Sequence, residues 1–92
     1  MKFEWDEEKE RANIRKHRVD FHMAARVFFD PDVLVRYDDI HSTEEDRYIA
    51  IGRVDETVLI LLVAYTERKD RIRIISARPA TKREKERYHY GN

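Results

Sequence analysis

The chain contains no cysteine and has only two glycines and two prolines among its 92 residues. Without cysteine it cannot form a disulfide framework, a thiolate nucleophile or a cysteine zinc site. Two glycines are too few for a phosphate-binding P-loop or a dinucleotide-binding fingerprint. These absences exclude several common kinds of catalytic and cofactor site, and they are compatible with a reducing compartment.

Long apolar segments are also missing. The longest apolar run, Val58 to Tyr65, is far too short to cross a bilayer. The first ten residues are mostly charged or polar and lack the apolar segment of a signal peptide. We therefore expect a soluble cytoplasmic protein without a membrane partner. The length predicts a single domain over residues 1–92 with one modest core.

The chain has no excess of charge of either sign, because 19 basic residues balance 19 acidic residues. The two signs are nevertheless distributed unevenly. Residues 38–46 contain five acids and no Lys or Arg, whereas residues 68–87 contain nine basic residues and three acids, a local net charge of +6. Arg outnumbers Lys by 13 to 6, and the planar guanidinium suits phosphate. The basic segment therefore favours phosphate binding, with a solvated, salt-bridged surface as the alternative.

The N-terminal third predicts one strand followed by two helices. Polar and apolar residues alternate over Lys2–Trp5, which is typical of a short strand. Asp6 is the expected cap of a first helix that ends near His17. Asp20 is the expected cap of a second helix that has an apolar stripe and stops before Pro31.

The remainder predicts four strands and a last helix. The strands begin at Val33, Arg47, Thr57 and Arg71, and the acidic residues 38–46 form the first connecting loop. Strict alternation in the last strand places Arg71 and Arg73 on one face and Arg78 on the other. Thr81 and Glu84 have the spacing of a capping box, so a helix is expected over residues 82–90. This helix has almost no apolar stripe, so it is either solvated or a partner contact, with Tyr88 packing it onto the sheet.

The expected fold class is thus α+β, with the element order β-α-α-β-β-β-β-α. Short turns between consecutive strands predict an antiparallel sheet on which the helices pack.

The sequence does not predict a metal centre or another cofactor. Its four histidines lack the spacing of metal ligands on a helix, and no paired-carboxylate motif is present. RNA cleavage without a metal remains possible, because the 2′-hydroxyl can attack the adjacent phosphate. That reaction needs a base, a proton donor and cations that stabilise the charge on phosphorus.

An ordered set of short motifs along nearly the whole chain resembles the BrnT family of toxins. The matching pieces are Phe3-Glu4-Trp5-Asp6, Lys9, Asn13, Lys16-His17, Phe21, Phe28-x-Asp30-Pro31, Glu45-x-Arg47-Tyr48, Gly52, Thr66-Glu67-Arg68, Arg71 to Arg78 and Glu86-Arg87-Tyr88. Any one piece is weak evidence, but the complete set in this order is specific. One departure is Arg18, because the family commonly has glycine after the Lys-His pair, where a helix ends in a left-handed turn.

The resemblance implies a RelE-like fold and a metal-independent endoribonuclease toxin of a type II toxin–antitoxin system, whose activity arrests growth. It also implies a BrnA-like antitoxin in an assembly of two toxins and two antitoxins, and contact with operator DNA only through that antitoxin.

Carried over by position, the family's polar residues fall on Lys16, His17, Glu67, Arg68, Arg73 and Arg78. By this resemblance the three arginines hold phosphate. Glu67 or His17 would then be the base, and Lys16 or His17 the proton donor.

Two other functions compete with the ribonuclease. The first is a non-catalytic binding module that keeps the fold and the antitoxin contact, because fold alone does not guarantee activity. The second is a DNA-binding regulator in its own right. The expected second helix argues against it, because that helix is apolar and offers only Arg26 to a nucleic acid.

Overall fold

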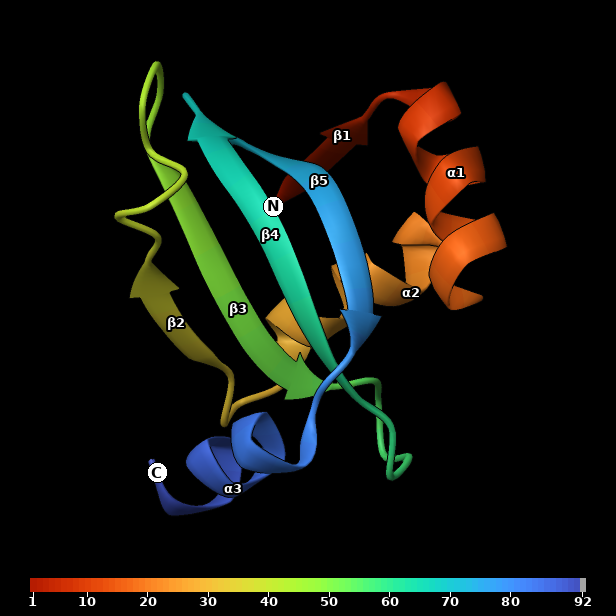
Figure 1. Cartoon of the computed structure of the whole chain (residues 1–92), viewed down its shortest axis with the longest axis vertical. Coiled ribbons are helices and arrows are strands. Elements are labelled where there is room, and N and C mark those ends of the chain that lie inside the picture. The colour runs from red at the N-terminus through yellow and green to blue at the C-terminus, as the bar shows by residue number, and fades with distance from the viewer. Residues whose placement is uncertain (92) are drawn as a thin grey trace.

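A computed structural model describes residues 1–91 as a five-stranded sheet with helices around it (Figure 1). The elements follow the chain as β1 (Lys2–Trp5), α1 (Glu7–His17), α2 (Phe21–Arg26), the 3-10 turn η1 (Val27–Phe29), β2 (Leu34–Tyr37), β3 (Arg47–Arg53), β4 (Ile60–Arg68), β5 (Arg71–Pro79) and α3 (Lys82–Tyr90). In the part of the chain described here, none of the helices is both long and apolar enough to span a membrane.

The sheet is mixed, which corrects the expectation of a purely antiparallel one. Its strand order is β1-β5-β4-β3-β2, and strands β2 to β5 form an antiparallel meander. The first strand instead lies parallel to β5, with Lys2 opposite Arg71 and Trp5 opposite Ile74. Short turns join antiparallel strands, but a chain that leaves β1 through α1 and α2 can return to the sheet in either direction. The direction of β1 therefore does not follow from turn length.

Both N-terminal helices begin where their caps predict. The Asp6 side chain accepts hydrogen bonds from the backbone N–H groups of Glu8 and Lys9, and Asp20 accepts one from Met23. At the end of α1, Arg18 adopts the left-handed conformation with φ 60° and ψ 30°. The turn is therefore the one that glycine commonly forms, and it is made here by a residue that adopts it at a cost.

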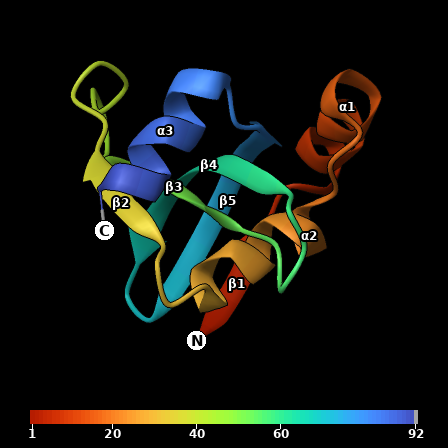
Figure 2. The same cartoon turned by 90° about the horizontal axis from the view of Figure 1, so that it is seen from below.

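The two faces of the sheet are covered unequally. One face, which we call the helix-covered face, packs against α2 and η1. There Phe21, Ala24 and Val27 are fully buried against Leu61 and Val63. Helix α3 lies on the opposite side of the sheet from α2 (Figure 2). It covers only one end of that second face, through Tyr88, which packs with Ile51 and Leu62 as predicted.

Helix α1 flanks the edge of β5 beyond the point where β1 ends. Its only buried residue is Asn13, whose side chain is hydrogen-bonded to the backbone of Ala77. Within residues 1–91, the part of the second face between α1, α3 and the loop of residues 38–46 carries no helix, and we call it the open face (Figure 1).

A bulge in the β4–β5 pairing changes which residues share a face. Ala64 lies opposite Ser76, but the next residue, Tyr65, lies opposite Ile74, so Ile75 is an extra residue in β5. The bulge places Ala77 in the same core as Ile74, where strict alternation predicted opposite faces.

Candidate active site

The bulge brings the arginines of β5 together on the open face. Arg71 and Arg73 both donate to Glu4 of β1, which lies on the side opposite the half-buried Trp5. Arg78, five residues later, lines a hollow on this same face, next to Leu62. The prediction that Arg78 points to the opposite face was therefore wrong, because alternation fails at an extra residue.

The open face consists of rows of residues that lie opposite one another on neighbouring strands. One row runs Arg47, Thr66, Arg73 and Glu4 across β3, β4, β5 and β1. The next row runs Arg36, Ile49, Ala64 and Ser76 across β2 to β5. The face thus has a floor of small and apolar side chains with arginines along its margins. Ser76 is half-buried on this floor and lines the hollow.

Three arginines of the predicted site are each held by a carboxylate. Arg78 makes a two-pronged pair with Glu84 of α3, at 2.8 and 2.9 Å. Arg73 bonds Glu4 at 3.1 Å, and Arg68 bonds Glu45 of the acidic loop at 3.2 Å. The carboxylate that engages Arg71 and Arg73 is Glu4 of β1.

These ion pairs shift the titration of their carboxylates. The hydrogen bond from Arg78 outweighs burial and lowers the pKa of Glu84 to about 2. Hydrogen bonds from Arg71 and Arg73 lower the pKa of Glu4. Both carboxylates are therefore ionised at neutral pH and partly neutralise the arginines they touch.

Glu67 lies on the helix-covered face of the sheet, on the other side from the three arginines. Burial, followed by the negative charges of Glu67 and Tyr48, raises the pKa of Tyr65 to about 12. The Tyr65 ring stacks on Tyr48 and is packed into the core beneath η1. The sheet thus separates Glu67 from Arg73 and Arg78.

Lys16 and His17 close α1, where they complement the negative end of the helix. Lys16 is exposed and His17 is half-buried. Helix α1 is attached to β5 through Asn13 and Ala77, so the pair lies at the flank of the sheet. The structure thus gathers Arg68, Arg73 and Arg78 on one face, with Glu67 on the opposite face and Lys16 and His17 at the flank of the sheet.

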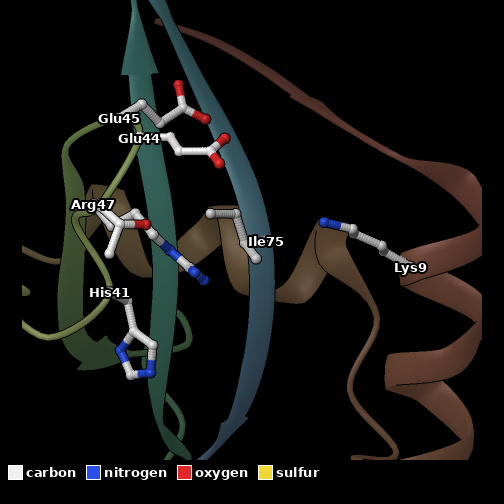
Figure 3. A pocket seen from close by; sticks show the side chains of 7 residues that line it. Lys9, His41, Glu44, Glu45, Arg47 and Ile75 are labelled. Carbon is white, nitrogen blue, oxygen red and sulfur yellow. The ribbon is translucent and has the colours of Figure 1, made fainter.

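Two hollows on the open face share lining residues that are not among the predicted site residues. Both are lined by His41 and Arg47, and the larger, of about 290 Å³, also contains Arg36, Ser76 and Arg78. The smaller includes Lys9 of α1 and Ile75 at the bulge (Figure 3). Alternation in β3 places Arg47 on this face, but no local signal indicates that the loop folds His41 over it.

Among residues 1–91, no group of three His, Asp or Glu side chains is arranged to hold a metal ion. The open face instead offers guanidinium, imidazole and ammonium groups, which can bind an anion and transfer protons. This combination matches the chemical needs of phosphodiester cleavage.

Comparison with known proteins identifies a family and a similar solved structure. The model of the BrnT family, described as the ribonuclease toxin of a type II toxin–antitoxin system, matches residues 5–84. The 1.1 Å crystal structure of the Brucella abortus ribonuclease toxin BrnT is similar, with a TM-score of 0.64 and 28% sequence identity. The match covers 89% of this chain and 99% of that one. No curated protein matches the chain significantly.

Proposed function

Since the chain belongs to the BrnT family of ribonuclease toxins of type II toxin–antitoxin systems, we propose that it cleaves RNA on the open face of its sheet. The observation that carries the proposal is the β5 bulge, which places Arg73 and Arg78 on the same face as Arg47. Three guanidinium groups around an apolar floor can bind successive phosphates of one strand.

The reaction is cleavage by the 2′-hydroxyl of the RNA itself, without a metal ion. Arginines on the open face neutralise the phosphate and the charge that develops on phosphorus. We assign this role to Arg68, Arg73 and Arg78 of the predicted set. Lys16 and His17 remain candidates for contacts at the flank of the sheet, and Glu67 for a contact on the helix-covered face.

The proposal includes a partner and a cellular effect. A BrnA-like antitoxin would neutralise the toxin in an assembly of two toxins and two antitoxins and would carry the operator-binding function. RNA cleavage by the unpaired toxin in the cytoplasm would arrest growth. The resemblance to the family implies a RelE-like fold, and a sheet that carries helices mainly on one face is compatible with such a fold.

One observation favours the alternative of a non-catalytic binding module. Arg68, Arg73 and Arg78 are each engaged by a carboxylate of the same chain, so none of them is available without breaking an ion pair. An inactive member that retained the antitoxin contact would tolerate such pairs.

Induced expression in a bacterial host separates the two functions. The wild type is compared with an Arg68→Ala/Arg78→Ala double variant and with Arg11→Ala/Arg83→Ala, which removes equal charge from the exposed faces of α1 and α3. We expect growth arrest and RNA loss with the wild type and the control, and neither with the double variant. Purified protein should cleave RNA equally well in EDTA.

Normal growth with abundant, folded wild-type protein would contradict the ribonuclease and favour the binding module. Circular dichroism of each variant shows whether it is folded.

A further inference from the structure

The arginines of the open face differ in whether a carboxylate of the same chain pairs with them. Arg68, Arg73 and Arg78 are neutralised by carboxylates, but Arg47 takes part in no ion pair within residues 1–91. Its Nε is buried and has no hydrogen-bond partner among the described residues. A buried guanidinium N–H without a partner is costly, and an anion bound in the hollow would satisfy it.

His41 is held in the same hollow by its own loop. Its Nδ1 lies 2.8 Å from the carboxylate of Asp38, which leaves Nε2 free of that contact. Although burial favours the neutral form of Asp38, the hydrogen bond and charge of His41 lower the pKa of this carboxyl. The carboxylate therefore orients the ring, as in enzymes where an acid fixes the tautomer of a catalytic histidine.

Ser42 fixes the loop that presents His41. Its hydroxyl oxygen lies 2.6 Å from the carbonyl of Asp38 and accepts a hydrogen bond of 2.9 Å from the backbone N–H of Arg47. The backbone N–H of Asp38 also donates to the carbonyl of Arg47 at 2.9 Å. The loop is thus closed at its base, and His41 and Arg47 are placed relative to each other by a hydrogen-bonded frame.

Lys9 approaches from the other side. It belongs to the first turn of α1, whose start is fixed by the Asp6 cap. Figure 3 shows the Lys9 ammonium pointing toward the Arg47 guanidinium across Ile75, with His41 on the Arg47 side. The bulge that exposes Ile75 on this face thus leaves one cation on each side of an apolar floor.

We propose that His41, Arg47 and Lys9 form the reacting centre for an RNA phosphodiester, an inference that rests on the proposed ribonuclease function. His41 Nε2 accepts the proton of the 2′-hydroxyl, and the 2′-oxygen attacks phosphorus. The bond from phosphorus to the 5′-oxygen breaks, and Lys9 gives that oxygen a proton. Arg47 binds the non-bridging oxygens throughout.

The products are a 2′,3′-cyclic phosphate and a 5′-hydroxyl, with the protons returned by exchange with water. A base and a proton donor on opposite sides of phosphorus suit the in-line geometry of this displacement. Glu45, which lines the smaller hollow, is a less suitable base, because it is already paired with Arg68. The role of Asp38 and Ser42 is positioning.

The pH dependence of cleavage tests the base directly. Histidine changes charge between about pH 5 and 8, so wild-type cleavage should rise over that range. The other charged groups that line the two hollows and face His41 are Lys9, Arg36, Asp38, Glu44, Glu45, Arg47, Arg78 and Glu84. Histidine is the one side-chain type lining the two hollows whose ordinary pKa lies near neutral pH, so His41→Ala should remove the rise.

The experiment measures cleavage of a defined RNA oligonucleotide and binding of its uncleavable 2′-O-methyl form. We expect His41→Ala and His41→Gln to slow cleavage about 10²- to 10⁴-fold and Arg47→Ala about 10²- to 10³-fold. Lys9→Met should slow it about 10²-fold. His89→Ala and Arg83→Ala, both exposed on α3, serve as matched controls with wild-type rates.

Binding distinguishes a failure of this centre from a failure of the ribonuclease. Arg47→Ala should weaken binding of the 2′-O-methyl RNA, and His41→Gln should leave it unchanged. If the wild type cleaves RNA and the His41 and Arg47 variants cleave as fast, the centre is overturned while the ribonuclease stands. If His17→Ala alone abolishes cleavage, the base is His17 and the centre is again overturned. If the wild type binds RNA without cleaving it, both proposals are overturned.

Discussion

The side chain of Asn13 in α1 is paired with the backbone of Ala77 in β5 as though it were part of another strand. Its Oδ1 accepts the N–H of Ala77 at 3.1 Å, and its Nδ2 donates to the Ala77 carbonyl at 2.8 Å. The same amide donates to the carbonyl of Val19 at 2.8 Å. One buried amide therefore satisfies the edge of β5 where β1 has ended and ties down the chain after α1.

Asn13→Ala should destabilise the fold strongly. The substitution leaves the N–H of Ala77 and the carbonyls of Val19 and Ala77 buried without partners. Each unsatisfied group can cost up to about 1–3 kcal/mol. We expect the free energy of unfolding to fall by about 2–3 kcal/mol in urea denaturation. Arg15→Ala, on the exposed side of α1, is the control and should change it by less than about 0.5 kcal/mol. Equal stability of Asn13→Ala and the wild type would show that water replaces the amide.

Arg18→Gly should stabilise the protein. Arg18 has a φ of 60°, which costs an L-residue about 1–2 kcal/mol. Glycine removes that cost but loses more entropy on folding, so a net gain of about 0.5–1 kcal/mol is expected. Thermal unfolding of Arg18→Gly and Arg15→Gly provides the comparison, because glycine inside α1 should lower the melting temperature. A lower melting temperature for Arg18→Gly would contradict the strain.

The Arg78–Glu84 pair should make the free energy of unfolding depend on pH in the acidic range. The pKa of Glu84 is about 2 in the folded chain, below its ordinary value of 4.5. A depressed pKa means that the stabilisation is complete above about pH 5 and is lost as pH falls toward 2. The loss should reach about 2–3 kcal/mol, because each pKa unit corresponds to about 1.4 kcal/mol and Arg78 is partly solvated.

Urea denaturation at pH 7 and pH 3 measures this effect. Glu84→Gln keeps the size of the capping side chain, so its stability should change less between the two pH values. An equal loss in the variant and the wild type would assign the acid sensitivity to other carboxylates, such as Asp30, whose pKa is also lowered.

Glu45→Gln should strengthen RNA binding. The carboxylate of Glu45 is paired with Arg68 and lines the hollow beside Arg47, where it repels phosphate. Neutralising it frees one more cation, so affinity for the 2′-O-methyl RNA should rise several-fold at low salt, with a steeper salt dependence. Glu56→Gln, in the β3–β4 turn, is the charge-matched control. Equal affinity of both variants would show that RNA does not approach Arg68.

Local signals determined much of this protein from the sequence alone. The caps at Asp6, Asp20 and Thr81 placed the starts of all three helices, because capping depends on residues within one turn. The alternation in β3 is a local signal of the same kind, because side chains in a regular strand have a period of two.

Tertiary structure decided what local signals could not. The extra residue at Ile75 shifts Arg78 onto the face of Arg73, and nothing in the Arg-Ile repeat of β5 indicates where a bulge falls. The parallel pairing of β1 and the position of His41 over Arg47 also depend on long-range contacts. Sequence could supply the basic residues of the candidate site, but only the folded sheet, through one bulge and one closed loop, determines which of them meet.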